Sequence, residues 1–237
     1  MCYSILGGRR NSRSRINARG SSAQADSYSL TGYGGKAFDA GSGTLNLSLG
    51  ASYTWHDITT QRYADAAGLP QKLEADYSGN TTQVFGELGY AMALTDGLTL
   101  EPFVGAGFSS LRTHAFTESG GDAALRGDVG RNNVTTSALG LHARSAFNST
   151  RVQGQLIGTL GWRHAFGDVD PASTMSFVQG GESFTTRGAP IARNAALVEL
   201  GVNMAVSKRT TVGVIYGGQF GDGSHQHSGA LDVRYRF

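Results

Sequence analysis

The sequence predicts an all-β protein, an antiparallel transmembrane β-barrel, and three observations lead to this prediction. Apolar and polar residues alternate along most of the chain, which is the pattern of strands with two different faces. Only 16% of the 237 residues are charged, and the 35 glycines are about twice the share found in an average protein, which is roughly 7%. The connections between the predicted strands alternate between short and long. A barrel with a wet lumen in a lipid bilayer has all three features.

Composition excludes several other classes of protein. A soluble domain of this length normally has a clear apolar core and a strongly charged surface, whereas this chain has only 39% hydrophobic residues and few charges. The net charge of +2 gives no indication of a nucleic-acid partner. The single cysteine, Cys2, excludes a disulfide scaffold and a cysteine-based zinc cluster. No run approaches the roughly 18 consecutive apolar residues that a membrane helix needs.

Ten segments carry the alternation and are predicted as strands. They are 3–16, 24–38, 43–61, 72–94, 97–117, 132–147, 151–166, 194–207, 209–220 and 228–237, of which the first shows the pattern weakly. In the third segment, for example, Leu47 and Leu49 alternate with Asn46 and Ser48. The apolar positions of the later strands are Val84, Leu88 and Tyr90; Leu98, Leu100 and Val104; Leu139 and Leu141; Leu156, Leu160 and Trp162; Val198, Leu200 and Val202; Val212, Val214 and Tyr216; and Leu231, Val233, Tyr235 and Phe237. No segment has the 3.6-residue period of a helix.

The predicted connections alternate between tight turns and long loops. Tight turns are expected at 39–42, 95–96, 148–150 and 208, and long connections at 17–23, 62–71, 118–131, 167–193 and 221–227. Outer-membrane barrels follow this rule, with short periplasmic turns and longer extracellular loops. The alternative is a soluble β-sandwich or a β-propeller, which would have to bury the polar strand faces without partners.

The longest connection, 167–193, is expected to fold back over the pore or to form an extra hairpin. Ser173–Phe177 and Ser183–Thr186 both have the composition of strands. Gly180 and Gly181 lie between them and are able to form the turn.

Eight short segments occur in an order and spacing that indicate one protein family. They are Ala18–Ser22, Tyr33–Lys36, Ala51–Ile58, Gln83–Tyr90, Leu100–Phe103, Leu160–Asp168, Pro190–Arg193 and Val233–Phe237. Each segment is common on its own, but together they are specific. On these segments, from about residue 19 onward, the chain resembles the translocator (β) domain of bacterial autotransporters, the type V secretion family.

The resemblance implies a barrel of twelve strands in the outer membrane, preceded by a helix that threads the pore and by a secreted passenger. This chain departs from that pattern, because only ten strands are predicted and residues 1–16, particularly Gly7-Gly8-Arg9-Arg10, match the family poorly. Residues 1–237 are interpreted as a single domain, an N-terminally truncated translocator. We therefore expect either a gap between 3–16 and 228–237 or a narrow ten-stranded closure.

The sequence indicates no catalytic, cofactor-binding or metal-binding site. No nucleophile elbow, zinc-protease or phosphate-loop motif occurs. His225 and His227 would lie on one side of an extended segment, but no third ligand is near in sequence, and a solvated outer loop is the favoured interpretation. Asp168 and Asp170 are compatible with a protease at the barrel rim, an alternative that their spacing does not support.

Charged residues on the polar strand faces are predicted to face the lumen, because a charge on the lipid face costs about 2–4 kcal/mol at the membrane midplane. Such pairs of charges steady a wide barrel across its strands, and a polar lining also lets an unfolded passenger slide without sticking. The predicted pore-lining residues are Glu87, Glu101, Arg144, Arg163, Glu199 and Arg234, and Asp232 and Arg236 share their parity.

The last strand carries the sharpest local signal. Leu231, Val233, Tyr235 and the terminal Phe237 are apolar at alternate positions up to the end of the chain. This pattern resembles the signal that the outer-membrane barrel assembly machinery reads, and a strand edge with alternating side chains is physically suited to such recognition. The alternative is an ordinary lipid-facing strand.

These inferences predict an outer-membrane translocator that supports export of its own passenger and is not an enzyme. The expected partners are outer-membrane lipid, the barrel assembly machinery, periplasmic chaperones and the passenger polypeptide, with no nucleic acid and no cofactor. A stand-alone porin-like or adhesin barrel without a secretion role is the alternative.

Overall fold

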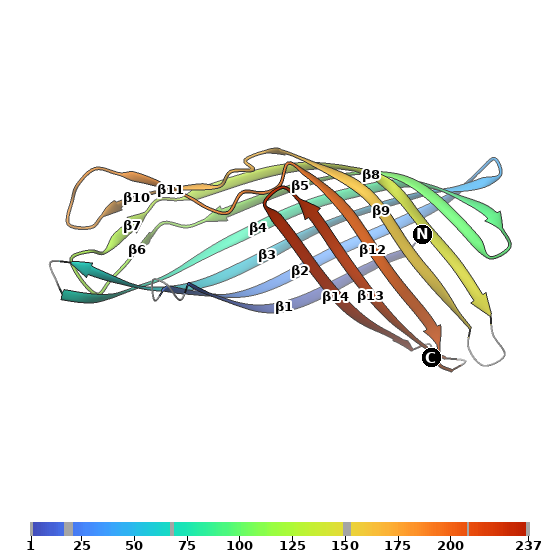
Figure 1. Cartoon of the computed structure of the whole chain (residues 1–237), viewed down its shortest axis with the longest axis horizontal. Helices are drawn as coiled ribbons and strands as arrows, with labels where there is room; N and C mark the ends of the chain where they lie inside the picture. Colours follow the sequence, from blue (N-terminus) through green and yellow to red (C-terminus); the bar gives the residue numbers. More distant parts are fainter. Residues whose placement is uncertain (1, 17–20, 67–68, 149–152, 208, 236–237) are drawn as a thin grey trace.

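The computed structural model describes residues 2–16, 21–66, 69–148, 153–207 and 209–235. Its main element is one antiparallel sheet of ten strands that curves around a central space (Figure 1). In sheet order the strands are β1 (Cys2–Ile16), β2 (Ser21–Ala40), β3 (Gly43–Ala66), β4 (Leu69–Thr95), β5 (Leu98–Thr113), β8 (Gly130–Asn148), β9 (Gln153–Gly167), β12 (Asn194–Ala205), β13 (Thr210–Gly221) and β14 (Ser224–Tyr235). The all-β prediction and its ten long strands are confirmed. The described residues contain no helix able to cross a membrane.

The connections at one end of the sheet are tight, as predicted. Residues 41–42 join β2 to β3, and residues 96–97 join β4 to β5. The predicted connections at 17–23, 148–150 and 208 fall wholly or partly outside the described residues. The long connections 118–131 and 167–193 lie at the opposite end, which is therefore the extracellular end of a barrel.

The prediction of long loops at 62–71 and 221–227 is wrong. β3 and β4 continue as paired strands to Ala66 and from Leu69. The apolar alternation stops before the pairing does, because a strand outside lipid needs no apolar face and is held by polar pairs such as Thr59 Oγ1 to Asp76 Oδ1 at 2.6 Å. β13 and β14 are joined by a tight turn whose Gly223 has a φ of 71°.

The strand register gives the sheet two different faces. Residues paired across neighbouring strands share a face, so Leu49, Gly86 and Ala106 lie in one row on the outward face. On that face Leu139 and Leu160 are 54% and 66% exposed, as expected of side chains that contact lipid. The buried side chains of the long strands lie on the inward face, where Glu101 is 4% exposed and Phe103 is 8% exposed. This arrangement confirms the predicted alternation.

A second sheet of four short strands lies at the extracellular end (Figure 1). Its order is β11 (Phe184–Arg187), β10 (Ala172–Phe177), β7 (Leu125–Gly127) and β6 (Phe116–Thr117). β10 and β11 form the hairpin predicted within 167–193. Gly180 and Gly181 between them have φ values of 103° and 128°, in the left-handed region that favours glycine.

The ten-stranded sheet has two free edges. Within the described residues β1 pairs only with β2, and β14 pairs only with β13, so the sheet order does not close. This is the gap that the sequence led us to expect as one of two outcomes. In a bilayer each unpaired backbone group costs several kcal/mol, so both edges require partners once the sheet is inserted.

Arginine substitution at two neighbouring residues of β3 tests the assignment of the two faces. Leu49 is 58% exposed on the outward face, and Ser48 is exposed on the inward face. Leu49→Arg should lower the free energy of unfolding in lipid vesicles by about 2–4 kcal/mol, whereas the control Ser48→Arg should change it little. Denaturant titration of the refolded chain measures both. Equal losses would contradict the assignment.

Candidate functional site

The candidate site is the inward surface of the curved sheet. A cavity of about 630 Å³ lies against this surface towards the extracellular end. It is lined by β4, β5, β8 and β9 and, across the lumen, by β13 and β14. Its polar lining residues include Gln83, Ser109, Thr136, Arg163, Gln219 and Gln226. The segment 189–192 of the long outer connection also lines the cavity, so this connection both forms a hairpin and reaches over the lumen.

A buried carboxylate organises the middle of this surface. Glu101 on β5 is 4% exposed, and its Oε2 lies 2.8 Å from an Arg144 guanidinium nitrogen on β8. Asn46 on β3 donates a hydrogen bond of 2.8 Å to the other oxygen, Oε1. Three strands are therefore linked through one side chain. The structure brings together two of the sequence-predicted residues, Glu101 and Arg144.

His142 on β8 extends this network. Its ring stacks on Phe103 with a centroid distance of 4.1 Å, its Nδ1 lies 2.8 Å from Thr159 Oγ1, and its Nε2 lies 3.2 Å from Glu87 Oε1. Sequence reasoning did not select Asn46, Phe103, His142 or Thr159 as site residues. Their inward parity was visible in the sequence, but the partners come from strands far apart along the chain.

Glycines make room for the two buried side chains of the network. A Cβ atom at Gly140 would lie 2.7 Å from Phe103 Cε1, and one at Gly161 would lie 3.4 Å from Phe103 Cζ. A Cβ atom at Gly89 would collide with Glu101 Oε1. The high glycine content on the inward face is therefore partly explained by the close approach of Glu101 and Phe103 to neighbouring backbone.

The other predicted pore-lining residues also lie on the inward face but have different surroundings. Within the described residues Arg163 and Glu199 have no ion-pair or hydrogen-bond partner, and the Nε atom of Arg163 is buried. Arg234 Nε lies 2.9 Å from Asp232 Oδ1 near the end of β14. Arg236 lies outside the described residues.

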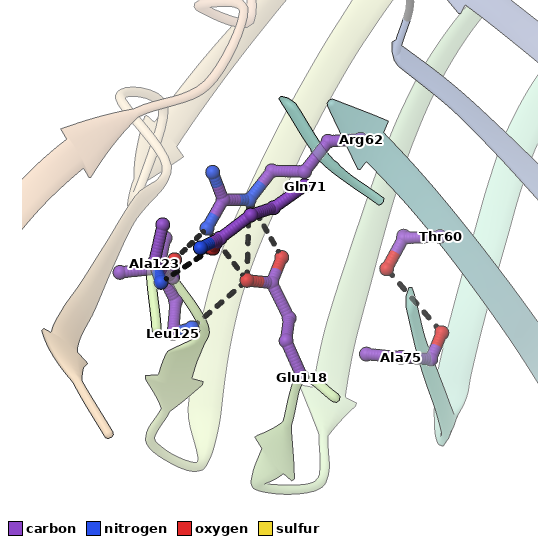
Figure 2. Close-up of polar contacts among 7 residues, drawn as sticks. All are labelled: Thr60, Arg62, Gln71, Ala75, Glu118, Ala123 and Leu125. Carbon is purple, nitrogen blue, oxygen red and sulfur yellow. Dashed lines mark hydrogen bonds and ion pairs between the residues drawn. The ribbon is translucent and has the colours of Figure 1, made fainter. Parts of the chain in front are cut away.

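An ion pair anchors the extracellular end (Figure 2). Arg62 on β3 donates from Nε and Nη2 to the carboxylate of Glu118 at 2.7–3.1 Å, and Glu118 is only 8% exposed. Arg62 Nη2 also donates to Ala123 O at 2.6 Å, and the backbone N–H of Leu125 donates to Glu118 Oε2 at 2.8 Å. Gln71 Oε1 accepts a hydrogen bond from Ala123 N at 2.9 Å. The long β3–β4 hairpin is thereby fastened to the connection that carries β6 and β7.

The same hairpin has three shifted pKa values that follow from local surroundings. The hydrogen bond from Lys72 to Glu74, with Nζ to Oε1 at 2.6 Å, lowers the pKa of the carboxyl and raises the pKa of the amine. Both groups are exposed, so this pair contributes little to stability. Burial raises the pKa of Tyr77, whose ring stacks on Phe116 at 4.8 Å.

The residues considered for catalysis or metal binding are dispersed. The prediction of a loop at 225–227 is wrong, because His225 and His227 lie in β14 on the outward face, where His227 Nδ1 is 2.8 Å from the Tyr216 hydroxyl. Asp168 accepts a hydrogen bond from Asn133 N at 2.8 Å, and Asp170 lies 4.0 Å from Arg193. Across the described ranges no group of three or more potential metal ligands is assembled.

Comparison with known proteins gives a consistent result. Residues 3–217 match the family described as "Autotransporter beta-domain". Two relatives from Serratia marcescens, each described as "Extracellular serine protease", are 33% identical over 217 residues and 32% identical over 213 residues. These alignments cover 92% and 90% of this chain but only 20% of each relative, so the chain spans about a fifth of their length.

The fold also matches a solved structure. The translocator domain of autotransporter NalP from Neisseria meningitidis superposes with a TM-score of 0.72 at 20% sequence identity. The superposition covers 99% of this chain and 75% of that chain.

Replacing Glu101 with alanine tests the network that Glu101 forms with Arg144 and Asn46 on the inward face. Glu101→Ala should lower the free energy of unfolding by about 1–3 kcal/mol, because Arg144 and Asn46 lose a shared acceptor. Glu199→Ala is the matched control, since Glu199 lies on the same face without a partner among the described residues. Denaturant titration in micelles compares the two variants, and an equal loss in both would contradict the network.

Proposed function

The chain belongs to the autotransporter β-domain family, and from this premise we propose that its inward surface is the path along which an unfolded passenger crosses. The domain is an outer-membrane β-barrel of type V secretion that supports export. The finer assignment proposed here concerns which charged residues line that path. They are Glu87, Glu101, Arg144, Arg163, Glu199 and Arg234, all on the inward face.

The observation that carries this proposal is the polarity of the inward surface. Most large exposed apolar side chains of the long strands lie outward, while the inward cavity has amide, hydroxyl and guanidinium groups beside apolar residues such as Phe85, Leu111 and Val134. The charged groups at the centre of the surface are already paired with each other, as in Glu101 with Arg144. A passing chain therefore meets polar groups along the lumen, and at the centre of the surface it meets charges that already have partners.

The protease activity named for the two relatives is inferred to lie outside the region that aligns with this chain. The two Serratia marcescens proteins are described as extracellular serine proteases, and this chain aligns with only a fifth of each. We infer that the catalytic residues lie in the part of those proteins that does not align, and that this domain itself is not an enzyme. The passenger that this domain exports would then be a secreted hydrolase of that class. The family match favours this role over a stand-alone porin-like or adhesin barrel.

Export is tested by fusing a signal peptide and an unfolded epitope-tagged reporter to the N-terminus of the chain. The reporter should become sensitive to protease added to intact cells, while a reporter without the barrel stays protected. Leu49→Arg in the same fusion should reduce reporter exposure together with insertion. Failure of the chain to insert, or insertion with the reporter still protected, would contradict the proposal.

The terminal strand is proposed to be read by the barrel assembly machinery, after delivery by periplasmic chaperones. Leu231, Val233 and Tyr235 lie outward on β14 with exposures of 72%, 62% and 55%, and β14 offers a free edge within the described residues. Phe237, the last member of the set, lies outside the described residues. An exposed edge with alternating apolar side chains supports recognition by strand addition.

Replacement of the last two residues separates an assembly signal from an ordinary strand. Burying a phenylalanine contributes roughly 1.5–3 kcal/mol, which would only weaken a finished barrel. Phe237→Ser should instead abolish most outer-membrane assembly, whereas Arg236→Ala should leave it nearly unchanged. Pulse-chase fractionation with equal synthesis measures both yields. Similar yields for the two variants would leave only an ordinary lipid-facing strand.

A further inference from the structure

Two arginines stand out on the lipid-facing surface of the sheet. Within the described residues of β5, β8, β9, β12, β13 and β14, the outward positions carry only two formal charges, Arg112 on β5 and Arg131 on β8. These two residues are direct cross-strand partners in the sheet register, and both are exposed. Every other outward position on these six strands is apolar or uncharged, with histidine counted as neutral.

The pair has no acidic partner in the described part of the chain. No ion pair or hydrogen bond joins either guanidinium to another described side chain. Asp168 accepts a hydrogen bond from Asn133 N, and neither it nor Asp128, three residues before Arg131, forms an ion pair with either arginine among the described residues. Like charges directly opposite each other on one face destabilise a sheet unless something neutralises them. By contrast, the outward Arg9 has Asp26 at 3.7 Å.

The register places the pair in one hydrogen-bonded row with two outward aromatic residues. Arg112 pairs on its other side with Asn80, which pairs with Trp55, which in turn pairs with Tyr28. Aromatic girdles mark the two membrane–water interfaces of outer-membrane barrels. β5 ends at Thr113 and leads into the extracellular connection, so Arg112 and its partner Arg131 lie at the extracellular end of their strands. The two guanidinium groups therefore lie at the depth of the outer-leaflet headgroups.

We propose that Arg112 and Arg131 form a binding site for the phosphate of a phosphorylated lipid in the outer leaflet. Directly opposed residues have Cβ atoms about 4.5–5.5 Å apart, a spacing that lets two guanidinium groups bind one phosphate. The planar guanidinium donates two parallel hydrogen bonds to phosphate oxygens, and the bound anion removes the repulsion between the arginines. Phe108 and Leu139, both exposed on the same strands towards the membrane centre, lie where acyl chains of that lipid pack.

The apolar surface directly below the pair is the reason to assign a lipid rather than a free phosphate ion. A soluble anion would gain nothing from Phe108 or Leu139, whereas a phospholipid or phosphorylated glycolipid uses both the headgroup and its chains. The site lies on the outward face and does not depend on the proposed translocation path. The lipid site can therefore be tested independently of passenger export.

Lipid retention by the refolded full chain tests this site. The chain is refolded in detergent micelles containing phosphatidylcholine with either diphosphoryl lipid A or the same lipid stripped of its phosphates, and native mass spectrometry measures the lipid retained. The wild-type chain should retain the phosphorylated form preferentially. The double variant Arg112→Gln/Arg131→Gln should lose roughly tenfold or more of that retention, the effect expected for charged hydrogen bonds.

Two further variants give the comparison its controls. Lys36→Gln removes an outward charge at the opposite end of the sheet, where Lys36 lies 4.7 Å from the Phe38 ring, and should leave retention unchanged. Arg112→Lys/Arg131→Lys keeps the charge but loses bidentate geometry. This variant should retain several-fold more of the phosphorylated lipid than the double glutamine variant, and less than the wild-type chain. Heat-modifiable migration on gels confirms that each variant has refolded. If the double glutamine variant does not refold, the double lysine variant is compared with the wild-type chain instead.

Four outcomes would overturn the proposal. These are equal retention by the wild-type and double glutamine variants, equal retention of the phosphorylated and stripped lipids, the same loss in Lys36→Gln, and full displacement of the lipid by inorganic phosphate. The last outcome would indicate a site for free anions instead of a lipid headgroup.

Discussion

The whole arrangement depends on one constraint, which is that neighbouring strands of the main sheet keep their antiparallel register along almost their whole length. Since side chains alternate between faces with a period of two, a slip of one residue would move every outward leucine inward and every inward charge into lipid. The register from β1 to β14 is continuous except for an irregularity near Ala93. Outward leucines such as Leu160 and inward charges such as Glu101 are therefore both consequences of the same pairing.

The inward face is organised differently from the core of a soluble domain. Its centre contains a buried carboxylate, a buried aromatic ring and a partly buried imidazole, while a small cluster of buried aliphatic residues, Val134, Ala165 and Val169, lies nearer the extracellular end. Glu101 is tolerated there because Arg144 and Asn46 supply its partners, and a buried charge without partners would be costly. The glycines next to Phe103 and Glu101 let these side chains lie close against the neighbouring backbone. The surface that stabilises the sheet is thus also the surface past which a passenger is proposed to move.

The extracellular end adds structure that the membrane does not require. The β3–β4 hairpin continues beyond the apolar band, and the Arg62–Glu118 ion pair joins it to the connection between β5 and β8. That connection pairs through β7 with the β10–β11 hairpin, so three outer segments form one unit above the lumen. Just below this unit, Arg112 and Arg131 face outward at the membrane boundary. The outer rim therefore has distinct faces towards the lumen, the solvent and the lipid.

The sequence alone determined the strands, their two faces and the hairpin in 167–193, because alternation and turn glycines act over neighbouring residues. It also placed Glu101 and Arg144 on the inward face. It did not reveal that β3 and β4 continue to Ala66 and Leu69, since pairing outside lipid leaves no apolar pattern. Only the tertiary structure joined Asn46 to Glu101, Arg62 to Glu118, and Arg112 to Arg131. These contacts connect residues on different strands, and which strand positions meet is decided by register and curvature, which no local pattern encodes.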